Sequence, residues 1–366
     1  MSVARIIVIL VVLAGLGAAA WFFFVRERAV TPQPNPQANL PPDDGSFRWG
    51  VQVRPFALNR YTDQLMAQQL DLAKELGVHF IRLDWHRDVK TQFNDADDFV
   101  WHDKVIDMAN ERGLHVILIL EDLGVASNDL SVTSKAATAS QAIASHYKGR
   151  IKYYQLLNEV SGAALKGPSQ PGTDFVRDFD QTKYRQIRDL VKGIGTGIKR
   201  ADPDAKLILS GQWTHTAMFE QLIKDGVSFD IIGWNWFSDM GEDLNGPVIS
   251  ESAHQKITLL DKLKGFGKEL WLTELNFRPG QDGQDEPKQA DYIKKVAERI
   301  FDYQTFKALF VFELMDQSEV LAKGGKSEYY GIVKFAKDAQ GNWIIGGKKQ
   351  AFDAYKQVIA KFSVQQ

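Results

Sequence analysis

YYQLLNE at residues 153–159 and LWLTE at residues 270–274 carry the strongest structural signal in the chain. Each is an apolar run about as long as one strand, and each ends in a glutamate, Glu159 or Glu274. A carboxylate at the tip of a buried strand is costly, because desolvation disfavours its charge. We therefore expect these two glutamates to have a chemical role.

Alternating strand and helix patterns extend from these stretches in both directions. HVILIL at residues 115–120 is nearly all apolar, as expected for a strand covered on both faces. Gly77 and Gly113 follow two helical patterns, where a helix stop is expected. The predicted strands are 48–53, 79–85, 115–120, 151–157, 206–210, 229–236, 270–273 and 309–312. The predicted helices are 63–76, 100–112, 134–147, 180–200, 217–224, 252–263, 288–303 and 350–362.

Eight strand–helix units in alternation predict an α/β fold, a (β/α)8 TIM barrel that spans residues 47–366. The alternative is a doubly wound open sheet, which usually has fewer strands and a glycine-rich phosphate turn after the first one. The glycine-rich stretch from Gly193 to Gly197 lies in a helical pattern, with no strand leading into it. We interpret it as a tight helix contact.

The N-terminal residues predict a membrane segment. Ile6 to Val25 is a run of 20 residues without a charge, long enough to cross a bilayer as a helix. This favours a transmembrane anchor at residues 1–28, followed by a proline-rich linker at residues 29–46. The expected location is the inner membrane, with one span and the barrel on the periplasmic or extracellular side. Ala18-Ala19-Ala20 keeps a cleaved signal peptide, and hence secretion, as the alternative.

Composition argues against several other classes of protein. Lys and Arg total 44 against 46 Asp and Glu, and this balance does not suit a nucleic-acid binder. Cys is absent, which rules out disulfides and thiolate metal sites. His86, His102, His215 and His254 have no metal-ligand spacing, so no metal or other cofactor is expected. Nothing in the sequence indicates a protein partner.

The predicted barrel indicates a function for the two glutamates. Reactive groups of this fold project from the carboxyl ends of the strands, where Glu159 and Glu274 end the fourth and the seventh. A pair of carboxylates facing one cleft is what cleavage of a glycosidic bond requires, one as acid and the other as nucleophile or base. The partner expected from this chemistry is a polysaccharide or oligosaccharide.

Asn158-Glu159 and Thr273-Glu274 on these two strands resemble the clan A retaining barrel glycosidases, with families 39 and 5 nearest. The resemblance implies that Glu159 is the general acid/base and Glu274 the nucleophile. It also implies that Asn158 holds the sugar hydroxyl beside the reacting carbon and that Arg82 lies under the nucleophile. For Arg82, a plain salt bridge in the barrel stays open.

The strand-six segment Gly233-Trp234-Asn235-Trp236-Phe237 departs from the pattern of that clan. The resemblance matches Asn235 to a histidine, and Phe237 stands where a tyrosine usually donates a hydrogen bond to the nucleophile. On strand eight, Phe312 takes the place of the tryptophan that often floors the reactive sugar. We expect weaker tuning of Glu274, or another donor in place of the missing hydroxyl.

Other residues at strand ends are candidates for contacting the sugar. The aromatic faces of Trp85, Trp213 and Trp236 suit stacking on sugar rings, although packing in the barrel is the alternative for each. Glu121 ends the third strand, where it either touches substrate or supports a loop. Even Glu159 and Glu274 have a structural alternative.

Two functions follow from these observations. The first is a membrane-tethered retaining glycosidase that cleaves a β-linked envelope or extracellular polysaccharide, favoured by the glutamate pair and Arg82. The second is a barrel with little or no turnover that binds polysaccharide during the secretion or assembly of an exopolysaccharide. Phe237 favours the second.

Overall fold

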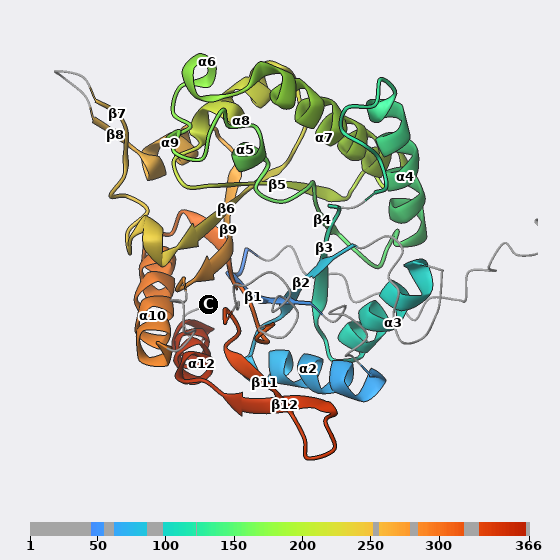
Figure 1. The fold of residues 1–366 in the computed structure, drawn as a ribbon, viewed down its shortest axis with the longest axis vertical. Coiled ribbons are helices and arrows are strands. Elements are labelled where there is room, and N and C mark those ends of the chain that lie inside the picture. Colours follow the sequence, from blue (N-terminus) through green and yellow to red (C-terminus); the bar gives the residue numbers. More distant parts are fainter. Residues whose placement is uncertain are drawn as a thin grey trace, which may run out of the picture. The chain divides into compact units, whose positions relative to one another are not determined.

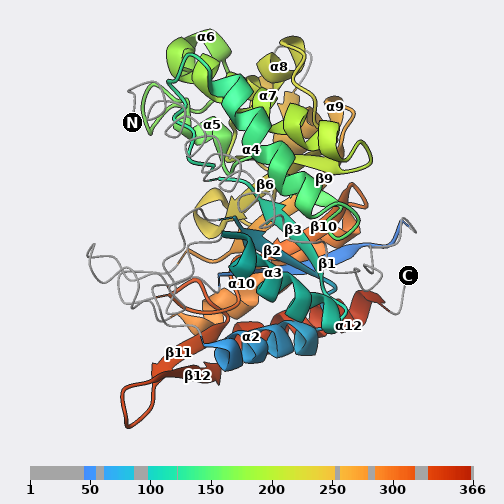
Figure 2. The same ribbon diagram turned by 90° about the vertical axis from the view of Figure 1, so that its right-hand side faces the viewer.

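Parallel strands close into a barrel in the computed structural model, which describes residues 45–54, 62–85, 98–121, 123–251, 256–278, 285–317 and 329–363 (Figures 1 and 2). Around the barrel the strand order is β1-β10-β9-β6-β5-β4-β3-β2, and every neighbouring pair is parallel. The strands are β1 (Arg48–Val53), β2 (Phe80–Asp84), β3 (His115–Ile119), β4 (Tyr153–Gln155), β5 (Lys206–Gln212), β6 (Ile231–Phe237), β9 (Glu269–Asn276) and β10 (Phe306–Val311). The predicted (β/α)8 barrel is confirmed.

Helices follow the strands and cover the outside of the barrel (Figure 1). They are α2 (Asp63–Leu76), α3 (Asp98–Glu111), α4 (Val132–His146), α5 (Val160–Ala163), α6 (Phe175–Asp178), α7 (Gln181–Ala201), α8 (Thr216–Lys224), α9 (Leu259–Gly265), α10 (Glu286–Asp302) and α12 (Gln350–Ser363). In α2 the Thr62 side chain accepts a hydrogen bond from the Leu65 amide, and Gly77 ends the helix with a left-handed φ of 85°. The predicted stop at Gly77 is therefore confirmed.

One predicted helix, at residues 252–263, is largely wrong. Residues 252–255 lie outside the described part, and Lys256–Thr258 form strand β8, which pairs antiparallel with β7 (Val248–Glu251). The helix starts only at Leu259, because Thr258 caps it: its hydroxyl accepts from the Asp261 amide in a capping box. The short helices α5 and α6, the 3-10 turn η1 (Ser238–Met240) and the hairpin of β11 (Val333–Lys337) and β12 (Trp343–Lys348) also escaped prediction.

The described residues contain no membrane span. No helix in these ranges is long and apolar enough to cross a bilayer. The predicted single-pass localisation in the inner membrane is accordingly corrected, since the structure provides no span to support it. The stretch on which that prediction rested, Ile6 to Val25, and the proline-rich linker lie outside the described residues.

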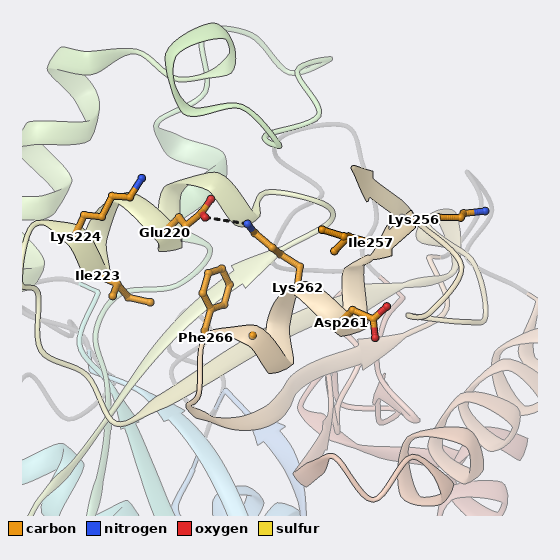
Figure 3. Close-up of a pocket in the computed structure, with 9 residues that line it drawn as sticks. Glu220, Ile223, Lys224, Lys256, Ile257, Asp261, Lys262 and Phe266 are labelled. Carbon is orange, nitrogen blue, oxygen red and sulfur yellow. Dashed lines mark ion pairs between the residues drawn. The ribbon is translucent and has the colours of Figure 1, made fainter. Parts of the chain in front are cut away.

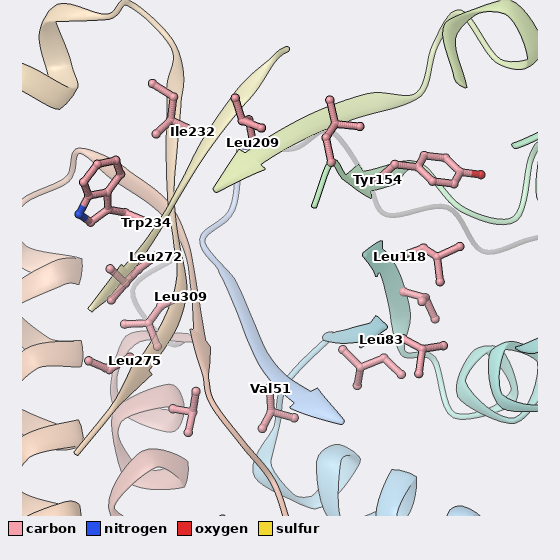
Figure 4. Close-up of a cluster of buried hydrophobic side chains, with 14 of the residues drawn as sticks. Val51, Leu83, Leu118, Tyr154, Leu209, Ile232, Trp234, Leu272, Leu275 and Leu309 are labelled. Atoms are coloured by element: carbon pink, nitrogen blue, oxygen red, sulfur yellow. The ribbon is translucent and has the colours of Figure 1, made fainter. Parts of the chain in front are cut away.

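The strands place apolar side chains on both of their faces. Outward residues such as Leu83, Leu118 and Leu209 pack beneath the helices (Figure 4). The inward layer is rich in aromatic rings, and Gly50 leaves room for one of them: a Cβ there would lie 2.1 Å from the Phe310 ring. The inward cluster consists of Phe80, Ile117, Tyr153, Ile208, Ile231, Trp271, Ala308 and Phe310. Polar side chains that point into the barrel lie above this apolar layer, towards the carboxyl ends of the strands.

The glycine-rich stretch of α7 is a tight helix contact, as predicted. A Cβ on Gly193 would lie 2.5 Å from the carbonyl oxygen of Thr133 on α4. One on Gly197 would lie 2.2 Å from both the carbonyl oxygen of Ala137 and the Ser140 hydroxyl. These glycines let α4 and α7 approach more closely than any larger residue allows.

Candidate active site

Glu274 reaches the barrel interior through a β-bulge in β9. Leu272 pairs with Trp234 of β6, but the next pair joins Glu274 to Asn235, so β9 has one extra residue. The pairing with β10 shifts over the same segment, from Leu272 to Leu275. A bulge re-aims side chains that would otherwise alternate between the two faces. Thr273 and Glu274 consequently both bond to groups inside the barrel.

Arg82 holds the Glu274 carboxylate from β2. Its guanidinium is 0% exposed and donates to Glu274 Oε1 at 3.1 Å, to the Thr273 carbonyl at 2.8 Å and to Gln155 Oε1 at 2.8 and 3.2 Å. A buried charge requires such a full set of partners, because desolvating it alone is very costly. Arg82 thus places a positive charge beside Glu274 and fixes its position.

Glu159 follows β4 in a backbone conformation that few residues adopt. Its φ is 47°, and that of Leu157 is 61°, both in the left-handed region. Such conformations cost about 1–3 kcal/mol each and persist where the surroundings enforce them. Here the Ser210 hydroxyl accepts from the Glu159 amide at 3.0 Å, and Asn235 Nδ2 donates to Glu159 Oε1 at 3.0 Å. These bends also end β4 earlier than predicted.

Burial, followed by the negative charge of Glu274, raises the pKa of Glu159 to about 7. The hydrogen bond from Asn235 and the charges of Arg278 and Arg82 act in the opposite direction. A carboxyl with this pKa is protonated in a large fraction of molecules near neutral pH, as a general acid must be. Glu274 instead lies within hydrogen-bonding distance of a cation, the Arg82 guanidinium, at 3.1 Å.

Asn158 links the two glutamates. It precedes Glu159 in the chain, yet its Nδ2 donates to Glu274 Oε1 at 3.0 Å. Its Oδ1 accepts from Gln155 Nε2 and from the Ser210 hydroxyl, both at 3.0 Å. The ends of β4 and β9 are therefore joined by one hydrogen-bonded network.

Asn235 lies in the same network, where its amide is oriented by a second residue. The Thr273 hydroxyl donates to Asn235 Oδ1 at 2.8 Å, which turns Nδ2 towards Glu159. Sequence reasoning selected Asn235 but missed Thr273, Gln155 and Ser210 as partners. Gln155 could have been noticed, because it is a polar residue inside an apolar strand.

The aromatic candidates differ in exposure. Trp213 is 37% exposed and stacks on Trp236, with ring centroids 6.5 Å apart, so its outer face is open to a ligand. Trp236 is itself buried, and its ring N–H donates to the Gly241 carbonyl at 2.9 Å. Trp85 is 4% exposed and stacks on His102 at 4.2 Å, beneath α3. We assign Trp85 to packing and leave it out of the proposed site.

Phe312 lies in a small aromatic cluster beyond the end of β10. Its ring contacts Phe237 edge-on at 6.1 Å and Tyr330 at 5.5 Å. Tyr330, which the sequence analysis missed, also lies 5.7 Å from Phe237, and its hydroxyl accepts from Arg278 Nη1 at 2.9 Å. A tyrosine hydroxyl thus stands close to the position where Phe237 lacks one.

Glu121 lies at the end of β3, beside the charged ends of β1 and β2. Asp84 pairs there with Arg54 at 3.1 Å, and the Arg54 guanidinium lies 5.0 Å from the Phe312 ring centre. Arg54 was also missed, because only the closed barrel brings the end of β1 beside the end of β2, where Asp84 lies. Glu121 is exposed and interacts electrostatically with Asp84, Arg54 and Glu274.

A surface cleft of about 540 Å³ lies elsewhere, outside the barrel between α8, β8 and α9 (Figure 3). Phe266 points into it, and an ion pair of 2.9 Å joins Lys262 to Glu220 across it. None of the predicted site residues lines this cleft. Over the described ranges there is also no group of three or more His, Cys, Asp or Glu placed to hold a metal ion.

Comparisons with known proteins bear on the fold. No protein-family model matches the sequence, and no curated protein matches it either. Among solved structures, the chain is similar to a family 1 β-glucosidase from Thermotoga maritima, with TM-score 0.59 and 14% identity over 86% of this chain and 97% of that one. A β-glucosidase from Thermotoga maritima in complex with deoxynojirimycin gives TM-score 0.61 and 15% identity over 87% and 98%.

A family 39 glycoside hydrolase from the gut symbiont Bacteroides cellulosilyticus WH2 gives TM-score 0.58 and 14% identity, over 86% of this chain and 64% of that one. At such identities the likeness concerns the fold. The predicted resemblance to the clan A glycosidase barrels is confirmed at that level, and family 39 is represented among these structures.

Proposed function

We propose that this chain is a retaining glycoside hydrolase that acts on a β-linked polysaccharide. The observation that carries the proposal is the hydrogen-bonded network in which Asn158 contacts Glu274 while Asn235 contacts Glu159. It holds two carboxyl groups of different character at one end of a glycosidase-like barrel. Glu274 has the cation Arg82 at 3.1 Å, and Glu159 has a pKa raised to about 7.

In the first step, Glu274 attacks the anomeric carbon and forms a bond to it. The glycosidic C–O bond breaks, its electron pair stays on the leaving oxygen, and Glu159 gives that oxygen a proton. In the second step, Glu159 as a carboxylate takes a proton from water, whose oxygen attacks the anomeric carbon and displaces Glu274. Two displacements at one carbon retain its configuration.

The remaining predicted residues would bind the sugar around this pair. Asn158 lies between the two glutamates and would hold the hydroxyl beside the reacting carbon. Trp213 directly follows β5, the next barrel strand after Glu159. Its exposed ring is suited to stacking on a sugar. Phe312 and the buried Trp236 would support the floor of the cleft, and Glu121 its rim.

Turnover by matched variants tests this function. Glu274→Gln removes the nucleophile, and we expect it to abolish hydrolysis of aryl β-glycosides and β-linked polysaccharides. Glu269→Gln is the control, because Glu269 lies on the same strand but at its amino end, where it pairs with Arg48 at 3.5 Å. Equal activity of wild type and Glu274→Gln would contradict the proposal.

Phe237 supports a second candidate function, a barrel that binds polysaccharide with little turnover. The ring lacks the hydroxyl that the clan uses beside the nucleophile, and the nearby Tyr330 hydroxyl is engaged by Arg278. This alternative predicts that wild type and Glu274→Gln bind the same glycans equally, with no product released by either.

A further inference from the structure

Gln155 is a buried polar residue in an otherwise apolar strand. It is 0% exposed, and it lies on the same face of β4 as Tyr153, whose ring belongs to the inward cluster. Its side chain therefore points into the barrel, on the carboxyl-end side of the aromatic layer. A buried amide is costly unless each of its groups has a partner, so the partners of Gln155 indicate what it does.

Arg82 determines which way the Gln155 amide is turned. The guanidinium donates to Gln155 Oε1 through Nε at 3.2 Å and through Nη2 at 2.8 Å. Arginine has five N–H donors and no acceptor, so only the oxygen of the amide can face it. The Gln155 nitrogen must consequently point the other way, towards the end of β4.

The nitrogen of Gln155 orients Asn158. Nε2 donates to Asn158 Oδ1 at 3.0 Å, and the Ser210 hydroxyl donates to the same oxygen at 3.0 Å. Because two donors hold its oxygen, Asn158 turns Nδ2 to Glu274 Oε1, at 3.0 Å. The reverse orientation would place an amide oxygen against a carboxylate, which only accepts. Gln155 thereby keeps a donor directed at the proposed nucleophile.

The same nitrogen holds the strained turn that carries Glu159. Leu157 and Glu159 have left-handed φ values of 61° and 47°, which persist only where the surroundings enforce them. Gln155 Nε2 donates to the Leu157 carbonyl at 3.0 Å and to the Ser210 hydroxyl at 3.1 Å. That hydroxyl in turn accepts from the Glu159 amide at 3.0 Å. Gln155 thus contacts the turn both directly and through Ser210.

We propose that Gln155 is a positioning residue for both glutamates, which it holds through the two ends of one side chain. Its oxygen secures Arg82, the cation beside Glu274. Its nitrogen secures Asn158 and the turn that ends in Glu159. The inference rests on the proposed function for the roles of the two glutamates, but the positioning itself is measurable without turnover.

Two substitutions separate the two ends of the Gln155 side chain. Gln155→Met has a similar length but provides neither donor nor acceptor. Gln155→Glu keeps an oxygen for Arg82 but replaces the nitrogen by a second acceptor. Gln69→Met is the matched control, because Gln69 is a glutamine of α2 that is 1% exposed and lies outside this network.

Hydrogen exchange of the Glu159 amide in the full-length protein measures how firmly the turn is held, with no substrate present. We expect exchange about tenfold faster in both Gln155→Met and Gln155→Glu, because Leu157 and Ser210 then lose the donor that holds them. Gln69→Met should leave the rate unchanged. NMR or mass spectrometry of the peptide that contains Glu159 gives the rate.

Steady-state kinetics on an aryl β-glycoside test the effect on the reaction. We expect both Gln155 variants to lower kcat about 10- to 100-fold while KM changes little, because misplaced groups weaken binding of the transition state more than binding of the substrate. If Gln155 served only as a buried acceptor for Arg82, Gln155→Glu would restore both kcat and the exchange rate. Gln69→Met should retain the kcat of wild type.

Wild-type exchange at Glu159 in both Gln155 variants would overturn the proposal, and so would an unchanged kcat. Full recovery of both quantities in Gln155→Glu, or equal losses in Gln69→Met, would also overturn it. Faster exchange in the Gln155 variants, together with no hydrolysis by wild type, would leave the positioning role standing while the proposed glycosidase fails. Hydrolysis that depends on Glu274 but not on Gln155 would do the reverse.

Discussion

Asn235 illustrates how a single amide can set the chemistry of its neighbour. It donates to Glu159 at 3.0 Å and is oriented by Thr273 at 2.8 Å. A hydrogen bond donated to a carboxylate stabilises the ionised form, so Asn235 opposes the effect of burial on the pKa of Glu159. In the proposed mechanism Glu159 acts in both forms, which makes this balance important for both steps.

The activity of the wild type should fall as pH rises through about 7, because the general acid Glu159 then loses its proton. Asn235→Ala removes the donor to the ionised form and therefore raises the pKa of Glu159. We expect the alkaline limb of kcat/KM to move up by about one pH unit. Thr273→Val should move it less, in the same direction. An unchanged or acid-shifted limb in Asn235→Ala would contradict this role.

Arg82 provides a second prediction at the residue scale. Its guanidinium makes bonds to Glu274, Thr273 and Gln155 that the three donors of a lysine ammonium cannot reproduce in the same plane. Arg82→Lys should therefore lower both activity and the free energy of unfolding, the latter by about 1–3 kcal/mol, because the ammonium keeps the charge but leaves acceptors of Gln155 and Thr273 without donors. Urea unfolding measures it, with the exposed Arg185→Lys on α7 as control. Full stability in Arg82→Lys would refute the account of this residue.

At the scale of elements, the β9 bulge could not be predicted from the sequence, whereas the contact of α4 with α7 could. The sequence LWLTELN shows no sign of an extra residue, because a bulge exists only relative to β6 and β10. The helix contact was predictable, since Gly193 and Gly197 lie one turn apart on one face of α7.

Gly197→Ala tests the helix contact. Its Cβ would lie 2.2 Å from backbone and side-chain atoms of α4, so the helices must separate. We expect a loss of about 1–3 kcal/mol in the free energy of unfolding, measured by denaturant titration. Gly265→Ala in α9 is the control, because a Cβ there meets no atom within 4 Å. That change should be neutral or slightly stabilising. A stabilised Gly197→Ala would show that the contact has been misinterpreted.

For the whole molecule, the barrel and its two glutamates could be predicted because strand and helix patterns are local. Arg82, Asn158 and Asn235 came from a resemblance of strand ends, and the structure joins all of them in one network with the glutamates. Tyr330 could not be found this way. It approaches Phe237 from the segment between β10 and β11, where no pattern in the sequence relates the two.

Long-range packing accounts for what the sequence left open at two other residues. Trp85 looks like a platform in the sequence, but α3 covers it with His102. Arg54 becomes important only once the barrel brings β1 beside β2, where it pairs with Asp84. Such facts depend on neighbours distant in the chain, which patterns of adjacent residues do not specify.

Covalent trapping tests the central claim most directly. A panel of aryl 2-deoxy-2-fluoro β-glycosides is incubated with the full-length protein, and the labelled peptide is identified by mass spectrometry. The fluorine slows both steps, but a good aryl leaving group lets the first proceed, so a glycosyl-enzyme accumulates. We predict one fluoroglycosyl group on Glu274, present in Glu269→Gln and absent in Glu274→Gln. A label on any other residue, or no label together with products of inverted configuration, would contradict the account.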